Sequence, residues 1–324
     1  DIERAATLYA QARALFGELG DAWGTALVLS NQGYLAREQG AYAEAAALHE
    51  QSLALFREVG DERNIAFTLN NLGEVLCDQG DYARAQALCE ESLAVRRSVG
   101  DPWGVAISTG SLGRVAQAQG AYARAAALYE ESLAIFRDLG ATWNMACILD
   151  DLSTLACKQG AYARAESLSA ESLALFREIQ DAKGAARTLT GAGQIARAQG
   201  DLARAERLCR ESLAVYRELG ALVGVIACLE CLAQVLYASQ AGPFTAARVE
   251  RGVQLWGATA ALRDARGTPR SPDDRAAYDD SIAPAREAMG TAAFAAAWAR
   301  GSALSVKQAI DLGLMEEAER TVRP

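Results

Sequence analysis

The chain has 324 residues, 51% of them hydrophobic, with a formal net charge of −9 and a sequence pI near 4.9. An acidic chain repels the phosphate backbone, so we expect no nucleic-acid partner. No apolar run approaches the ~18–20 residues that cross a bilayer, and no signal segment opens the sequence. We therefore expect a cytoplasmic protein that makes no contact with a membrane.

The sequence repeats itself every forty residues. NNLGEVLCDQGDYARAQALCEESL at 70–93 returns as GSLGRVAQAQGAYARAAALYEESL at 110–133, with further copies at 150–173, 190–213 and, more loosely, 30–53. A fixed period of this kind is typical of a solenoid, in which each unit packs on its neighbours. The first twenty residues align with the second half of a unit. We therefore expect the chain to begin within a repeat, as a piece of a longer protein.

Each forty-residue unit predicts two antiparallel helices. Residues 61–80 run from Asp61, a suitable N-cap, to Gly80, which suits the left-handed position after a helix, and residues 81–100 follow the same design. Between these ends the apolar residues recur at steps of three and four, which is the helical period. Pro102 is expected at a helix start.

The units resemble tetratricopeptide repeats. Leu72 and Gly73 match the L-G signature, Gly80 the turn, Tyr82 the aromatic residue after it, and Ala85 the small residue of the second helix. Small residues there allow the two helices to approach closely. The usual period of this repeat is about 34 residues, and the longer unit is similar to a variant found in signalling adaptors and regulators. The resemblance implies an all-α superhelical solenoid over residues 1–240.

Past Gln240 the repeat pattern weakens. Residues 241–267 predict a degenerate second helix with Phe244 in the tyrosine position, and residues 268–324 predict a helical C-terminal extension that closes the array. Within this extension we expect a loop at 268–274, a helix near 273–289, another over TAAFAAAWARG, and a last one, VKQAIDLGL, capped by Ser305.

Residues 245–312 carry a second resemblance. They are similar to the C-terminal end of the repeat region in large bacterial regulators, namely multidomain signal-transduction ATPases and LuxR-type transcription factors. In those proteins an ATPase module precedes the repeats and a helix-turn-helix domain lies at one terminus. Neither is visible in this sequence. The resemblance implies that the chain is the sensory or regulatory arm of such a protein.

No motif for catalysis is present. The sequence has no phosphate-binding loop and no dinucleotide fingerprint. His49 is the single histidine, and its equivalents in the other units are Tyr9, Cys89, Tyr129, Ser169 and Cys209, which indicates a packing position. The pair Cys228 and Cys231 has zinc-like spacing but lacks a second pair or a nearby histidine. We expect structural thiols, no metal, no cofactor and no enzyme activity.

Binding residues are expected on the first helix of each pair. In tetratricopeptide arrays this helix lines a concave groove, and the positions that should face it vary here while the frame stays constant. The candidates are Asn31, Tyr34, Asn70, Asn71, Glu74, Arg114, Asp150, Asp151 and Gln194. Amides suit an extended peptide backbone because they both donate and accept. The same variation also fits an unconstrained solvated face, and both interpretations stay open.

Three tryptophans recur near the start of the first helices. They are Trp23, Trp103 and Trp143, and Arg63, Lys183 and Val223 replace them in other units. A position that accepts both kinds of residue is expected to be half-exposed at a repeat junction, where it caps the neighbouring helix pair or anchors an interface.

These features together predict a non-catalytic scaffold. Its expected partners are a protein or peptide, a small-molecule effector, or other domains of the parent chain. Beside the sensory arm, two alternatives remain: a constitutive adaptor and an intramolecular autoinhibitory module.

Overall fold

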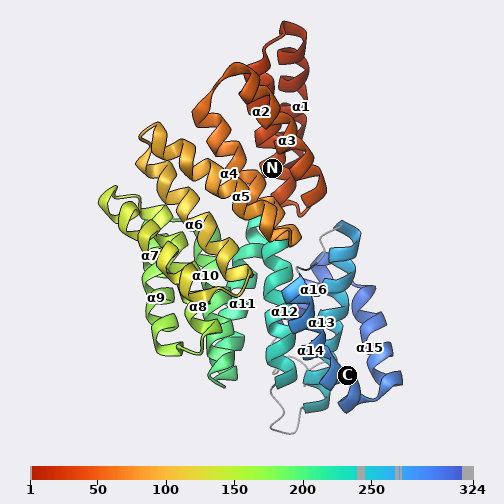
Figure 1. The fold of residues 1–324 in the computed structure, drawn as a ribbon. Helices are drawn as coiled ribbons and strands as arrows, with labels where there is room; N and C mark the ends of the chain where they lie inside the picture. Colours follow the sequence, from red (N-terminus) through yellow and green to blue (C-terminus); the bar gives the residue numbers. More distant parts are fainter. Residues whose placement is uncertain (1, 239–244, 267–269, 271, 316–324) are drawn as a thin grey trace. The chain divides into compact units, whose positions relative to one another are not determined.

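The computed structural model describes residues 2–238, 245–266, 270 and 272–315, and they form sixteen α-helices (Figure 1). No strand occurs among these residues, so the all-α fold expected from the repeats is confirmed. None of the helices that the structure describes is long and apolar enough to span a membrane.

Helices alternate along the chain as the forty-residue period predicts. The first helices of the six pairs are α2 (Ala22–Glu38), α4 (Glu62–Gln79), α6 (Pro102–Ala118), α8 (Thr142–Lys158), α10 (Ala182–Ala198) and α12 (Leu222–Ala238). The second helices are α3 (Tyr42–Val59), α5 (Tyr82–Ser98), α7 (Tyr122–Asp138), α9 (Tyr162–Glu178), α11 (Leu202–Leu219) and α13 (Thr245–Arg266). Before them, α1 (Ile2–Leu19) corresponds to a second helix. The last three helices are α14 (Pro272–Met289), α15 (Thr291–Ser302) and α16 (Val306–Leu314).

The chain forms two compact units that divide within α8. Unit 1 contains residues 1–151 and unit 2 contains residues 152–324. Both have a core of aliphatic side chains between the helices of successive pairs. The core of unit 2 continues from the repeats into α13 to α16, with Trp256 of α13 fully buried in it.

The helix joints follow from aspartate and glycine. Helix α4 begins after Asp61, whose carboxylate accepts a hydrogen bond from the Asn64 N–H at 3.1 Å, and it ends at Gly80 with a φ of 86°. A left-handed residue of this kind satisfies the last carbonyls of a helix, and glycine adopts it without a steric penalty. Gln180 takes the glycine position in one unit and still has a φ of 57°.

Small residues set the distance between the two helices of a pair. A Cβ atom added to Gly73 would lie 2.6 Å from the Cys89 sulfur and 3.2 Å from the Ala85 carbonyl oxygen. Where Ser153 replaces this glycine, its hydroxyl donates to the Ala165 carbonyl at 2.8 Å. The close packing expected from the repeat is confirmed, because the alanine position is 0% exposed in the five pairs from α2/α3 to α10/α11. These alanines are Ala45, Ala85, Ala125, Ala165 and Ala205.

In four of the pairs a serine on the second helix bonds to the first helix. Ser52 donates to the carbonyl of Ala26 at 2.8 Å, and Ser132 donates to that of Ala106 at the same distance. Both hydroxyls are buried, so each bond is made away from competing water. The serine recurs at Ser92 and Ser212 with the same kind of partner.

The junction tryptophans are half-exposed, as the sequence predicts. Trp23, Trp103 and Trp143 are 42%, 43% and 52% exposed. The indole N–H of Trp23 donates to Asp61 at 2.9 Å. Since Asp61 is the N-cap of α4, Trp23 supports the start of the next helix pair.

In unit 2 the last helix is held by arginines. The guanidinium of Arg251 on α13 donates to the carbonyls of Leu312, Gly313 and Met315 at 2.8, 3.0 and 2.7 Å. These bonds satisfy the carbonyls that a helix leaves free at its C-terminal end. Arg210 on α11 adds a bond to the Met315 carbonyl at 2.9 Å. Helix α16 is thereby fixed against α11, α12 and α13.

The helices expected in the C-terminal extension are present. Helix α16 begins after Ser305, which forms a capping box with Gln308, and α14 and α15 cover the two segments predicted before it. Phe244 and residues 268, 269 and 271 of the expected loop lie outside the described residues, and residues 272–274 already belong to α14.

Candidate functional site

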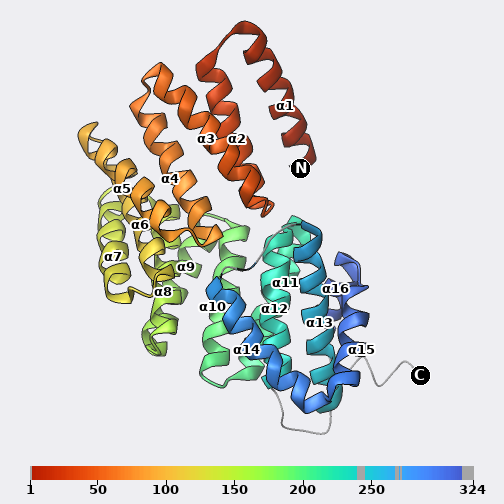
Figure 2. The ribbon, with the colours of Figure 1, turned by 45° about the vertical axis from the view of Figure 1, so that its right-hand side comes forward.

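The first helices of successive pairs pack against one another in unit 1. Helix α4 contacts both α2 and α6, and Figure 2 shows the three in succession. Side chains from three units therefore meet on one face, which we call the first-helix face. It comprises the residues of α2, α4 and α6 at the candidate positions and one turn beyond them.

Four charged side chains form a network across this face. Glu74 on α4 lies 2.5 Å from Arg37 on α2 and 3.3 Å from Arg114 on α6. Asp78, one turn further along α4, lies 2.8 Å from Arg37 and 3.2 Å from Arg114. The four side chains are 19–34% exposed. The network thus joins three helix pairs. Because its side chains are partly buried, water and salt screen these ion pairs less than pairs on the open surface.

The network holds its members in the charged state. Burial alone would raise the pKa of Glu74, but the positive charges of Arg37 and Arg114 and a hydrogen bond from Ser111 outweigh it and lower the pKa to about 2. Burial likewise opposes the charge on Arg114, and the carboxylates of Glu74, Asp78 and Asp151 more than compensate and raise its pKa. A carboxylate fixed in this way is ionised at neutral pH and cannot act as a general acid.

Polar atoms beside the network have unused hydrogen-bonding capacity. The Asn70 side-chain amide donates to the Ser111 hydroxyl at 3.2 Å, and that hydroxyl donates to Glu74 at 2.8 Å. The Asn70 carbonyl oxygen and the Asn71 amide nitrogen are buried and have no partner among the described residues. Such atoms are rare in proteins, and here the chain itself shields them from solvent.

The nine candidate residues do not share one environment. Asn70 and Asp150 are only 3% and 9% exposed, so their expected place on an open surface is wrong. Asn70 lies where neighbouring first helices pack, as its contact with Ser111 shows.

The remaining candidates lie nearer to solvent. Asn31, Asn71 and Asp151 are half-buried, whereas Tyr34 is 53% exposed. Glu74 and Arg114 belong to the network. Gln194 is exposed and belongs to unit 2.

Two members of the network are not among the sequence candidates. Arg37 lies three residues after Tyr34, and Asp78 lies four residues after Glu74. Residues three and four apart share one side of a helix, so this spacing could have identified both. The signal in the sequence is that Arg37 and Asp78 carry opposite charges in adjacent units.

His49 lies directly beneath this face. It is 0% exposed, and a Cβ atom on Gly33 would lie 2.8 Å from its ring. Burial and the charge of Arg37 lower the pKa of His49 to about 4, so the ring is neutral at pH 7. The packing role expected from the repeat is confirmed by this burial.

Five of the seven thiols are buried as well, and Cys147 and Cys157 are partly exposed. Cys89, Cys209 and Cys228 are 0% exposed, and burial raises the pKa of Cys89 to about 12. Among the residues that the structure describes, no three His, Cys, Asp or Glu side chains are grouped so as to hold a metal ion.

Comparison with known families supports the repeat assignment. A family model described as "Tetratricopeptide repeat" matches residues 64–138 and 144–218, and a second one with the same description matches residues 25–59. Together they cover more than half of the chain. No curated protein matches the sequence.

Solved structures share the fold at low sequence identity. The Rap conjugation gene regulator of the plasmid pLS20 in complex with the Phr* peptide is 14% identical, with a TM-score of 0.62 over 80% of this chain and 70% of that one. A Rap protein complexed with competence and sporulation factor is 15% identical, with a TM-score of 0.54 over 70% and 68%. BtubC (BKLC) from P. vanneervenii is 19% identical, with a TM-score of 0.52 over 68% and 91%. At these identities the likeness shows the fold alone.

Proposed function

We propose, since the chain belongs to the tetratricopeptide-repeat family, that it is a non-catalytic scaffold whose first-helix face in unit 1 binds a protein segment or peptide. The observation that carries the proposal is the polar network on this face. A repeated frame of glycine and alanine is constant from unit to unit, while this one face changes its charges and amides. Charged groups and amides on a rigid frame select a partner by charge and hydrogen bonding.

Two further facts support a peptide as the ligand. Asn31 and Asn71 are half-buried on this face, and a side-chain amide can both donate to and accept from a peptide backbone. The two Rap structures that share this fold contain a Phr* peptide and a competence and sporulation factor. That binding belongs to those proteins, and we extend it to this chain as part of the proposal.

The test is a peptide selection followed by titration. Peptides selected from a random library on the whole chain are titrated against a variant with Asn31→Ala, Tyr34→Ala and Asn71→Ala. The control carries Arg84→Ala, Arg97→Ala and Arg124→Ala on second helices, where these side chains are 50–59% exposed. We expect the first variant to lose affinity by about tenfold or more, equivalent to about 1.4 kcal/mol, and the control to bind normally. Equal binding by both variants would place the peptide elsewhere.

We also propose that the scaffold is the sensory or regulatory arm of a bacterial signal-transduction ATPase or transcriptional regulator. The similarity of residues 245–312 to the end of the repeat region in such regulators supports this. A regulator responds to its ligand by a shift between conformations, which requires different affinities for the two. Small-angle scattering of the whole chain, with and without the selected peptide, checks this: a changed radius of gyration is expected. An unchanged one would favour a constitutive adaptor.

A further inference from the structure

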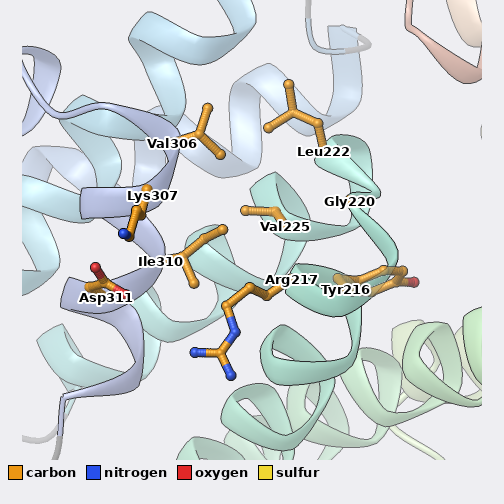
Figure 3. A pocket seen from close by; sticks show the side chains of 9 residues that line it. All are labelled: Tyr216, Arg217, Gly220, Leu222, Val225, Val306, Lys307, Ile310 and Asp311. Carbon is orange, nitrogen blue, oxygen red and sulfur yellow. The ribbon is translucent and has the colours of Figure 1, made fainter. Parts of the chain in front are cut away.

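Unit 2 contains a cavity of about 470 Å³ between the end of α11, the start of α12 and the N-terminal half of α16 (Figure 3). Cavities of about 300–1,000 Å³ are the size in which proteins bind small molecules. We propose that this cavity binds a small apolar carboxylate, such as a fatty acid of medium length. The apolar part of its wall consists of Tyr216, Leu222, Val225, Val306 and Ile310.

The anchoring of α16 at its C-terminal end fixes the position of this helix beside the cavity. At its C-terminal end the helix lies very close to the repeats, because a Cβ atom on Gly313 would lie 2.7 Å from Leu213 and 2.8 Å from Leu229. Arg251 fixes the same end through three carbonyls. The opposite end forms one wall of the cavity through Val306 and Ile310. The cavity is therefore bounded by a helix that is held in place elsewhere.

Charged groups gather on one side of the cavity. In Figure 3 the charged ends of Arg217, Lys307 and Asp311 lie on one side, and Leu222 and Val306 lie on the other. Lys307 and Asp311 are one turn apart on α16, where opposite charges offset each other. Arg217 then supplies the net positive charge. An open, mostly apolar pocket with one net positive charge at its edge complements an apolar molecule that carries one carboxylate.

Arg217 is free for this role because the repeat changes at its position. In earlier units the equivalent arginine pairs with a glutamate 34 residues later, as in Arg57–Glu91 at 2.8 Å and Arg177–Glu211 at 3.3 Å. The residue 34 positions after Arg217 is Arg251, which binds the carbonyls of α16 instead. No ion pair involves Arg217 within the described part of the chain. A free guanidinium can bind a carboxylate with two parallel hydrogen bonds.

This site goes beyond the proposed function, because it lies wholly in unit 2 and involves none of the residues of the first-helix face. The experiment is isothermal titration of the whole chain with octanoate, octanol and octylamine, each below the concentration at which it forms micelles. We expect saturable 1:1 binding of octanoate and weaker binding of the other two. Arg217→Gln should weaken octanoate binding by about tenfold or more, because glutamine has no charge and cannot form two parallel hydrogen bonds with the carboxylate.

Two further variants make the result decisive. Arg177→Gln changes the equivalent arginine one unit earlier, away from the cavity, and should bind octanoate like the parent chain. Val306→Trp fills the cavity and should abolish binding while the circular dichroism spectrum stays helical. The proposal is overturned if octanoate gives no saturable heat, if octanol binds equally well, or if Arg217→Gln leaves the affinity unchanged.

Discussion

Arg114 on α6 lies 3.3 Å from the carboxylate of Glu74 on α4, although the two residues are one full repeat apart in the sequence. Arg37 on α2 approaches the same carboxylate from the other side, at 2.5 Å. One partly buried anion therefore links three successive helix pairs. The first-helix face of unit 1 depends on this residue both for its charge and for its rigidity.

Replacing Glu74 by glutamine should destabilise unit 1. The neutral side chain would leave Arg37 and Arg114 facing each other with one carboxylate fewer between them. Breaking a buried ion pair costs about 3–5 kcal/mol, and partial exposure reduces this to about 2 kcal/mol. Urea unfolding measures the loss.

Glu90→Gln is the matched control for that substitution. Glu90 pairs with Arg124 on the surface, where both side chains are 50% exposed. We expect its loss to stay below about 1 kcal/mol. Equal losses in the two variants would show that the network contributes no more than a surface pair.

The stability of the chain should fall as the pH drops from about 6.5 to about 4. The pKa of His49 is about 4 in the folded chain and 6.5 when unperturbed, so the unfolded chain takes up the proton first. Protonation then favours unfolding throughout this window, by about 3 kcal/mol in total at 1.36 kcal/mol for each pKa unit. Urea unfolding at a series of pH values measures this.

A His49→Cys variant should remove that pH dependence. Cysteine occupies the equivalent position at Cys89, where it is 0% exposed, so the position accepts it. Glu74 acts in a lower window, since its lowered pKa contributes stability that is lost as the pH falls from 4.5 to about 2. An unaltered slope between pH 6.5 and 4 in the His49→Cys variant would assign the effect to another group.

Arg96→Phe should stabilise the chain. Arg96 is 3% exposed in a position that holds Phe56, Phe136 and Phe176 in other units, and one of its nitrogens has no partner among the described residues. Burial lowers the pKa of Arg96, which shows that the environment disfavours its charge. Replacing a buried ion pair by a well-packed apolar side chain often gains about 1–4 kcal/mol.

Thermal unfolding checks this prediction. Gly104 leaves room for an aromatic ring at residue 96, as Gly184 does for Phe176. A lower melting temperature in Arg96→Phe would mean that the ion pair of Arg96 with Asp101, at 3.1 Å, contributes more than the ring.

Gln180→Gly should also stabilise the chain, here by removing backbone strain at a positive φ. Gln180 has a φ of 57° at a joint where Gly60 and Gly220 have φ values of 77° and 62°. A residue with a Cβ atom pays about 1 kcal/mol or more in this conformation. The reciprocal change Gly140→Gln, at a φ of 64°, should cost about the same amount in chemical denaturation. If Gln180→Gly and Gly140→Gln change the free energy of unfolding in the same direction, this explanation is wrong.

The sequence predicts the frame well because the frame depends on local chemistry. An aspartate before a helix and a glycine after it act within a few residues, as at Asp61 and Gly80. The small residue at Gly73 likewise serves one helix pair, since it faces Cys89 of the same pair. The period then repeats these local rules along the chain.

The candidate site was harder to predict because it depends on contacts between units. Asn70 is buried where its helix packs on the next unit, and there it donates a hydrogen bond to Ser111. No pattern within one repeat displays this contact. The C-terminal extension has no repeat to align with. The position of α16 and the contacts of Arg251 therefore depend entirely on tertiary packing. Arg96 also departs from its repeat. The equivalent position is aromatic in other units, so the repeat pattern does not predict a buried arginine there.

Photocrosslinking from Tyr34 tests the central claim most directly. Tyr34 is 53% exposed on the first-helix face, so the larger side chain of benzoylphenylalanine can extend into solvent there. The matched control carries the same group in place of Tyr122, at the start of the second helix α7. If unit 1 binds its ligand on the first-helix face, the selected peptide should crosslink from residue 34 and not from residue 122. Crosslinking from residue 122 alone would contradict the account and place the ligand on the second helices.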